Sequence, residues 1–305
     1  MRFEKSLFLG VIAPALMAGL LAGPAAFADQ GVYPKTEEEK QAAYDALNWQ
    51  GEPKDYSLSR SHAQIHLPNG EYLLLGNDAQ RYSWLAEGIE FPDTEAVLTL
   101  DSEDAALVYI EWRDEGYVND SDWKDVDADE LLSQYTESTE QSNEARAANG
   151  IKAMHVVGWL LRPDYDATTR TVTYALELKN DQGNWANVVA LRLGRSGYAE
   201  MTWVGAIETV RSGTRPALLQ STLDAFEYDE GHRYTDFQEG DKVAAFGIGG
   251  LLAAALGVKF GAKGFAAIIA FLVAGKKVII PAVLLGGGAI AKFWRRIFNR
   301  GGAQS

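Results

Sequence analysis

The sequence predicts an α+β fold, in which an antiparallel sheet with packed helices forms a soluble ectodomain, followed by a C-terminal helical membrane anchor. Three observations carry this prediction. Apolar and polar residues alternate through much of residues 153–206, capping residues precede several polar stretches, and an acidic body gives way to basic, apolar sequence at residue 242. Alternation is typical of half-buried strands, and capping residues mark the starts of helices.

Strands that are joined by short links rich in Gly, Asn and Asp are expected to be antiparallel neighbours. In the second of four such strands, Val172, Tyr174 and Leu176 share one face, and Thr171 and Thr173 share the other. One face of the sheet is therefore buried, while the other is wet or covered by helices. The four predicted strands are 153–161, 170–179, 184–193 and 197–206.

The N-terminal half of the chain contains further strand signals. Alternation predicts a strand at residues 63–67, and the sequence PNG at 68–70 predicts a tight turn into a returning strand at 71–75. We expect these two strands to pair as a hairpin. Two more strands are predicted at 96–100 and 106–112.

Capping residues mark three helix starts. Thr36 and Glu39 have the spacing of a capping box, and Asn77 and Asp127 each precede a helical stretch. The third of these helices is mostly polar, so only one stripe, which includes Leu131, is expected to be buried. The predicted helices are 36–47, 78–87, 128–148 and, from its amphipathic pattern, 215–226.

Charge is distributed unevenly along the chain. Residues 29–241 carry 41 acidic and 17 basic side chains, a net charge of −24, whereas residues 242–305 carry nine basic and no acidic ones. The acidic body repels nucleic acid, because phosphate binding needs a clustered basic face. The basic, apolar C-terminal part suits an anionic membrane surface. Cysteine is absent, which excludes disulfides and thiol chemistry.

The first 28 residues have the features of a secretory signal peptide. Arg2 and Lys5 precede an apolar run, and the sequence AFA at 26–28 is a cleavage site of A-x-A type. We expect cleavage after Ala28; an uncleaved N-terminal anchor is the alternative. The predicted organisation is a signal peptide (1–28), an extracytoplasmic α+β domain (29–241), a transmembrane or membrane-associated helical anchor (242–298) and a tail (299–305).

The predicted anchor contains three apolar runs separated by lysines, at 243–258, 265–274 and 278–291. Each is shorter than the about 20 residues of an ordinary transmembrane helix. We expect one span near 243–262, and either an interfacial hairpin or a second short span at 264–298, so the number of crossings stays open. A helical hairpin in a soluble core is the alternative. The recurrent glycines also permit self-association in the membrane.

The histidines offer only weak candidates for chemistry. His62 and His66 are four residues apart, but in a strand they would lie on one face about 13 Å apart, too far to share a metal ion. His155 lies in an apolar strand, where a hydrogen-bonded core or edge histidine is expected. We predict structural or surface roles for all three.

The acidic run at 120–130 invites a calcium site. An EF-hand loop that starts at Asp125 needs Gly at its sixth position and Glu at its twelfth, but these positions hold Glu130 and Thr136. Helix capping and a solvated surface are therefore expected, and loose calcium binding is left open.

No other motif predicts chemistry. The sequence LGRSG at 193–197 lacks the G-x-S-x-G spacing of a nucleophile elbow and is expected to be a turn between strands. Arg192 and Arg195 can bind an anion or pair with carboxylates. The sheet tryptophans Trp159, Trp185 and Trp203 are expected to pack rather than bind a ligand. No catalytic, cofactor-binding or metal-ligating residue, and no cofactor, is predicted.

Several phrases together resemble the DUF2167 family of membrane-anchored bacterial proteins. They are GYVND (116–120), DADELL (127–132), NEARAANG (143–150), GWLLRPDYD (158–166), LGRSG (193–197) and RYTDFQEGDKVAAFG (233–247). The resemblance covers roughly residues 50–260, and departs at NVVALR (187–192), where the family tends to have an Asn-Tyr-Asn-like run. It implies a signal peptide, an extracytoplasmic domain and a C-terminal anchor, and carries over no catalytic residue.

The leading functional hypothesis is a non-enzymatic, membrane-anchored envelope protein that binds a partner or senses the state of the envelope. Its expected partners are the lipid bilayer and another membrane or envelope protein. Two alternatives stay open: a membrane-tethered hydrolase using carboxylates of residues 114–130, and a scaffold subunit of a membrane complex.

Overall fold

The structure is a computed structural model that describes residues 33–87, 91–100, 106–148 and 152–256. A seven-stranded antiparallel sheet with the order β3-β4-β5-β10-β9-β8-β7 forms the centre of this part of the chain. Its strands are β3 (Glu71–Leu75), β4 (Thr94–Leu100), β5 (Leu107–Arg113), β7 (His155–Asp166), β8 (Thr171–Asn180), β9 (Gly183–Leu193) and β10 (Tyr198–Val204). The predicted α+β class and the antiparallel order of the last four strands are confirmed.

Two smaller sheets complete the strand structure of the described residues. One has the order β1-β2-β11 and consists of β1 (Asp55–Leu58), β2 (Ala63–His66) and β11 (Phe226–Tyr228). The other is a parallel pair, β6 (Tyr117–Asn119) with β12 (Val243–Gly247).

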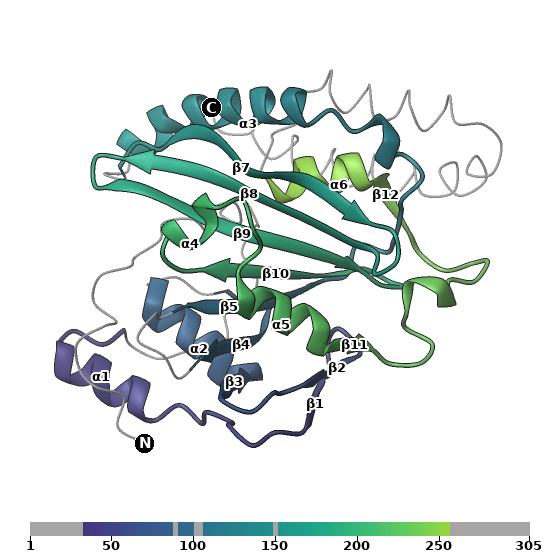
Figure 1. Ribbon diagram of the computed structural model, residues 1–305. Coiled ribbons are helices and arrows are strands. Elements are labelled where there is room, and N and C mark those ends of the chain that lie inside the picture. Colours follow the sequence, from purple (N-terminus) through teal and green to yellow (C-terminus); the bar gives the residue numbers. More distant parts are fainter. Residues whose placement is uncertain (1–32, 88–90, 101–105, 149–151, 257–305) are drawn as a thin grey trace, which may run out of the picture. The chain divides into compact units, whose positions relative to one another are not determined.

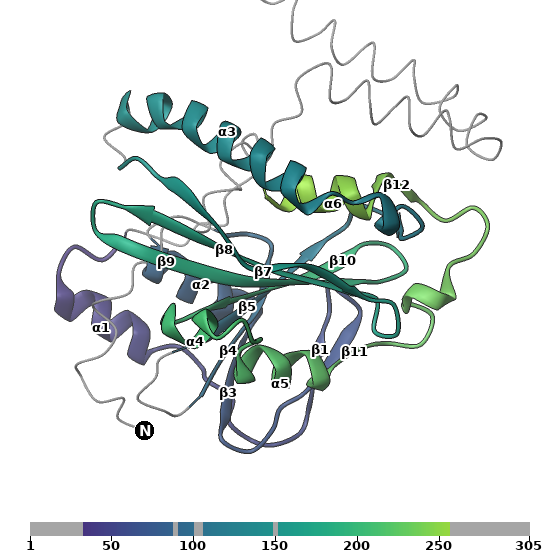
Figure 2. The same ribbon diagram turned by 45° about the horizontal axis from the view of Figure 1, so that its top comes forward.

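Helices cover both sides of the large sheet. They are α1 (Glu37–Asp45), α2 (Gly76–Glu87), α3 (Ala128–Ala148), α4 (Glu208–Arg211), α5 (Ala217–Ala225) and α6 (Ile248–Ala255), with short 3-10 helices η2 (Trp123–Asp125) and η3 (Tyr234–Asp236). Figures 1 and 2 show α3 and α6 on one side of the sheet and α4 and α5 on the other. Residues of one strand therefore alternate between two packed interiors.

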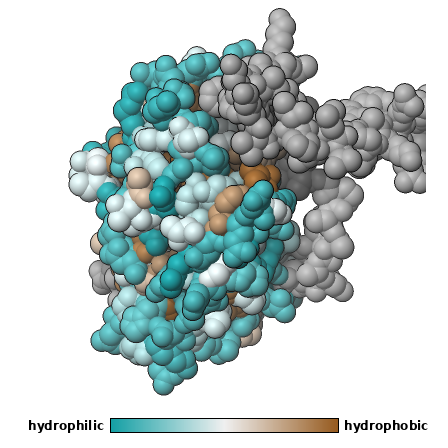
Figure 3. All heavy atoms as spheres, turned by 90° about the vertical axis from the view of Figure 1, so that its right-hand side faces the viewer, coloured by the Kyte–Doolittle hydropathy of each residue, from teal (hydrophilic) through white to brown (hydrophobic). Residues whose placement is uncertain are grey.

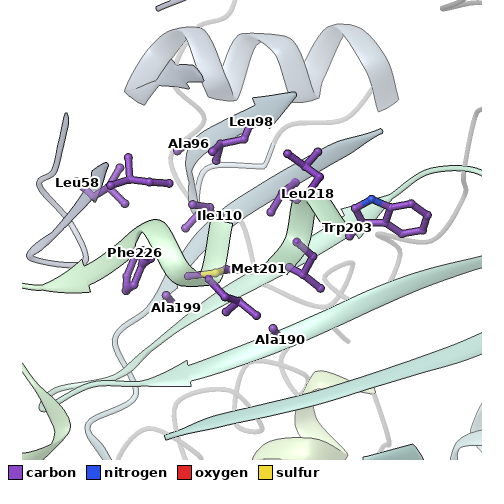
Figure 4. Packing of buried hydrophobic residues seen from close by; sticks show 14 of the residues in the cluster. Leu58, Ala96, Leu98, Ile110, Ala190, Ala199, Met201, Trp203, Leu218 and Phe226 are labelled. Carbon is purple, nitrogen blue, oxygen red and sulfur yellow. The ribbon is translucent and has the colours of Figure 1, made fainter. Parts of the chain in front are cut away.

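The main core lies between the seven-stranded sheet, helix α5 and the three-stranded sheet β1-β2-β11. Leu98, Ile110, Met201 and Trp203 pack there with Leu218 of α5, and all five are at least 97% buried (Figure 4). The neighbouring strand residues face the other way: Val97 and Tyr109 pack with Ala79 and Tyr82 of α2. Strands β4 and β5 are therefore buried on both faces over nearly their whole length.

Two of the three predicted helix caps are confirmed. The hydroxyl of Thr36 accepts the amide of Glu39 at 3.1 Å, and the Glu39 carboxylate accepts the amide of Thr36 at 3.3 Å. Asp127 accepts the amides of Asp129 and Glu130 at 2.9 and 3.1 Å. The third prediction is wrong, because α2 begins at Gly76, ahead of Asn77.

The predicted hairpin of residues 63–67 and 71–75 is also wrong. β2 pairs with β1 and β11, whereas β3 pairs with β4 in the large sheet. A turn with His62 in the left-handed region (φ 51°) brings the preceding strand, β1, alongside β2. The PNG turn therefore directs the chain from one sheet to another rather than closing a hairpin.

The structure differs from the prediction at the start of the 242–298 segment. Its first residues form strand β12 rather than a helix, and α6 then runs for only eight residues. Ile248, Leu251 and Leu252 of α6 are fully buried. Within the described ranges, none of the helices has the length and apolarity that crossing a bilayer requires. The signal peptide, the rest of the predicted anchor and the tail lie outside the described residues.

A pair of carboxylates lies in the sheet where β5 and β10 are neighbours. Glu111 and Glu200 are directly opposite each other in the register. Glu111 is 4% exposed and bonds to Arg113, whose guanidinium also contacts Asp93 at 2.7 Å and Glu200 at 3.3 Å. Burial, together with the negative charge of Glu200, raises the pKa of Glu111 to about 7.

We predict that this carboxyl group lowers the stability of the fold as pH rises. In the unfolded chain Glu111 ionises near its ordinary pKa, while in the fold it stays protonated up to about 7. The stabilising contribution of Glu111 to the free energy of unfolding is therefore complete below about pH 4.5 and is lost as pH approaches 7. Glu111→Gln removes this titration, so the decrease in unfolding free energy from about pH 5 to about pH 8 should be smaller by about 1–3 kcal/mol.

Urea unfolding of both proteins at the two pH values measures this difference. Glu137→Gln, an exposed change on α3, serves as the matched control and should retain the wild-type pH dependence. An unchanged pH dependence in Glu111→Gln would show that the buried carboxyl does not titrate as described.

Candidate functional site

The start of the C-terminal segment is held by residues more than 100 positions earlier in the chain. β12 pairs in parallel with β6, with Val243 opposite Tyr117 and Gly247 opposite Asn119. The Tyr117 amide donates to the Lys242 carbonyl at 2.8 Å. We call the contact between residues 116–122 and residues 233–249 the junction. It contains two of the phrases that carry the family resemblance.

Asp122 fixes the beginning of α6 at this junction. Its carboxylate accepts the amides of Ile248 and Gly249 at 2.9 and 3.2 Å. The first amides of a helix have no partner within the helix, so an acceptor placed here satisfies them and interacts well with the helix dipole. Burial raises the pKa of Asp122, and these amide hydrogen bonds partly oppose the rise.

Two glycines permit the close approach at the junction. A Cβ at Gly247 would overlap the Asp122 carboxylate. A Cβ at Gly116 would lie 2.8 Å from the Lys242 carbonyl, and the φ of Gly116 is 93°, which side chains rarely adopt. Only glycine therefore fits both positions without displacement of the backbone or of the cap.

Aromatic side chains fill the centre of the junction. The Tyr117 ring stacks on Tyr234 with centroids 4.5 Å apart, and Phe237 lies 4.1 Å from the same ring. The Tyr234 hydroxyl donates to the Val118 carbonyl at 3.1 Å and accepts the amide of Asp120 at 3.2 Å. Tyr234 thus joins η3 to β6 through both its ring and its hydroxyl.

Asp120 links the junction to the turn between β7 and β8. Its carboxylate accepts the Tyr165 hydroxyl at 2.6 Å and forms an ion pair with Arg170. Burial alone would raise the pKa of Asp120, but the Tyr165 hydrogen bond and the Arg170 charge hold it below its ordinary value. The Arg170 guanidinium also lies 5.0 Å from the Tyr234 ring centroid, within cation–π range.

A second ion pair lies just ahead of β12. Arg195, in the turn between β9 and β10, contacts both oxygens of Asp241 at 2.7 and 2.9 Å. Paired oxygens suit the planar fork of a guanidinium. The Arg195 hydrogen bonds lower the pKa of Asp241 to about 2. Of the two roles left open for Arg195, the structure shows pairing with a carboxylate. The predicted turn at 193–197 is confirmed, and in it the Gly194 amide donates to the Gly197 carbonyl.

The histidines take structural or surface positions. His66 contacts Asp55 at 2.7 Å on the surface, and His155 of the edge strand β7 contacts Glu140 of α3 at 2.7 Å. His62 lies in a turn and not on the strand face predicted for it; its ring stacks on His232 at 4.0 Å. In the part of the chain that the structure describes, no three His, Cys, Asp or Glu side chains are placed to hold a metal ion.

The acidic run serves mainly to fix other elements. Asp120 and Asp122 hold the junction, Asp127 caps α3, and Asp129 pairs with Arg162 at 2.8 Å. Capping and surface roles were predicted from the sequence, but the cap on α6 was not. The phrases GYVND and RYTDFQEGDKVAAFG were visible, yet a single sequence does not show that they meet.

The tryptophans pack as predicted. Trp203 is 2% exposed within the main core, and the Trp159 indole donates to the Ala128 carbonyl at 3.0 Å, which fixes the start of α3 against β7. Trp185 packs against the buried cluster that Val97 and Tyr109 form with Tyr82 of α2.

The described residues therefore form an antiparallel α+β domain that holds the first part of its own C-terminal segment. The chain belongs to the family described as "Protein of unknown function (DUF2167)", which matches residues 50–287. The resemblance indicated by the sequence phrases is confirmed. Family membership assigns no activity, so the function must be argued from the site itself.

Other comparisons add little. No curated protein matches the chain. Among solved structures, the chain is similar to the solution structure of cyanobacterial PsbP (CyanoP) from Synechocystis sp. PCC 6803. The identity is 13%, the match covers 69% of this chain and 100% of that chain, and the TM-score is 0.34.

We predict that Asp122→Ala releases the start of α6. The change removes the acceptor for two helix amides, which should cost about 1–2 kcal/mol of local stability. Thermolysin should then cleave within residues 243–256 faster than in the wild type, as mass spectrometry of the fragments can show. Asp125→Ala, an exposed change in the same 3-10 turn, is the matched control. Equal cleavage rates for the two variants would contradict the capping role.

Proposed function

We propose that this chain is a membrane-anchored cell-envelope protein whose domain, residues 29–241, is a non-enzymatic binding or envelope-sensing module. Residues 1–28 direct export and are removed, so the domain lies on the periplasmic side of a bacterial inner membrane. The anchor lies within residues 242–298, after the docked β12 and α6. The lipid bilayer and another envelope protein are the partners of this proposal.

The junction is the observation that carries the proposal. A domain joined to its anchor by a loose linker needs no specific contacts at the boundary. Here a strand pair, the Asp122 cap and the Arg195–Asp241 ion pair hold the start of the C-terminal segment against the domain. A change in the domain can therefore be transmitted to the following residues, as a sensing module requires.

The roles of the acidic residues support binding over hydrolysis. The alternative enzyme would use carboxylates of residues 114–130 as acid and base. In this region Asp120, Asp122 and Asp127 are engaged by an arginine or by backbone amides. Burial raises the pKa of Asp122, but that carboxylate is occupied by α6. These bonds are of the kind that structural carboxylates make, which supports the binding module over the hydrolase.

Protease accessibility tests the proposed location. We expect an epitope tag inserted after Ala28 to be cut by protease added to spheroplasts, and a tag at Ser305 to be protected if the anchor crosses once. Cleavage of both tags, with the chain in the membrane fraction, would fit an anchor that returns to the same side. An intact N-terminal tag, or recovery of the chain in the soluble fraction, would contradict the proposal.

A further inference from the structure

A surface pocket of about 250 Å³ lies beside the junction, between the β7–β8 turn, β11 and the start of η3. Three arginines from separate elements line it: Arg170, Arg192 and Arg233. Three threonines, Thr168, Thr169 and Thr235, add hydroxyl groups. The end of the molecule that carries the loop after β11 is mostly hydrophilic (Figure 3), so recognition there depends on polar groups rather than on an apolar groove.

The three arginines differ in how their charges are compensated. Arg170 is paired with Asp120, and Arg233 is paired with Glu227 at 2.7 Å. Among the described residues, no carboxylate forms an ion pair with Arg192. Arg192 is therefore the arginine of this pocket whose charge is not balanced by a directly paired carboxylate, although Asp224 and Asp166 attract it from farther away.

Arg192 is fixed in place but not neutralised. Its Nε donates to the Thr171 hydroxyl at 3.1 Å, and its Nη1 donates to the Phe226 carbonyl at 3.1 Å. No described residue accepts a hydrogen bond from Nη2. Burial lowers the pKa of Arg192, the direction expected for a cation that has lost water without gaining a close anion. A desolvated, unpaired charge is costly, and an incoming anion relieves that cost.

We propose that this pocket binds a small ligand through a single carboxylate, which the guanidinium of Arg192 holds while the neighbouring arginines and threonine hydroxyls surround it. The unpaired charge of Arg192 matches one carboxylate, and its Nη2 is the atom left to donate to that carboxylate. The pocket is smaller than most drug-sized ligand sites, which limits the ligand to a few heavy atoms. The acidic surface of the domain repels polyanions, so the ligand carries little further negative charge.

This assignment rests on the proposed binding role and gives that role a ligand class. The pocket shares Arg233 and Tyr234 with the junction, and its Arg170 pairs with Asp120 of the junction. A ligand carboxylate that contacts Arg170 competes with Asp120 for the hydrogen bonds that the Arg170 guanidinium donates. A ligand in this pocket can therefore alter the junction contacts that hold the C-terminal segment.

Binding of lactate to the full mature chain in mild detergent tests the proposal, with lactamide as the uncharged analogue and inorganic phosphate as a different anion. Ligand-observed NMR titration gives the affinities. We expect lactate to bind, lactamide not to bind, and phosphate to bind more weakly than lactate. Absence of lactate binding, equal binding of lactamide, or tighter binding of phosphate would each overturn the assignment.

Two substitutions with opposite effects on the affinity for lactate test which residues form the binding site. Arg192→Gln should weaken lactate binding by about tenfold or more, because it removes a charge-assisted contact. Glu227→Gln, an exposed change, should strengthen binding by about two- to fivefold, because it removes the negative charge on the pocket wall. Arg162→Gln, on the surface outside the pocket, is the control and should have no effect.

The Glu227 variant keeps the test decisive if Arg192→Gln fails to fold. Unchanged affinity in Glu227→Gln, or in a folded Arg192→Gln, would overturn the assignment. The protease experiment above is independent of this one. If lactate fails to bind while the tags report an anchored, exported domain, the ligand class is wrong and the proposed location stands.

Discussion

The carboxylate of Asp122 connects two parts of the chain that the sequence keeps far apart. By accepting the amides of Ile248 and Gly249, it sets where α6 begins. The approach that this bond demands leaves no room for a Cβ at Gly247. It also places β12 against β6, so that the apolar face of α6 is buried. A single acceptor therefore fixes where α6 begins and how it lies against the domain.

The large sheet provides the rigid frame for this contact. Its central strands are buried on both faces, and the turns at one of its ends carry the groups that reach the junction. Arg170 comes from the β7–β8 turn and Arg195 from the β9–β10 turn, and each pairs with an aspartate of the junction. The pocket with Arg192 lies at the same end. The proposed binding pocket and the junction therefore lie at the same end of the large sheet.

Local features of the fold could be predicted from the sequence, whereas long-range pairings could not. The Thr36 capping box and the Asp127 cap involve residues three positions apart, and their geometry follows from spacing alone. Strands β7 to β10 were visible because alternation and short links act over a few residues. The expected hairpin of residues 63–67 and 71–75 failed because sheet membership depends on β1 and β11, which local pattern does not reveal. Strand β12 was taken for helix because its apolar residues fit either state.

The central claim is that the start of the C-terminal segment is a structural part of the domain. Hydrogen exchange at the Tyr117 amide, which donates to the Lys242 carbonyl, tests this claim most directly. The measurement is made on the full mature chain in detergent by mass spectrometry with residue-level fragmentation. The account predicts slow exchange at this amide, comparable to that of the central strands, because opening requires the junction to separate. Exchange at the rate of a loop amide would mean that β12 is not held, and would contradict the account.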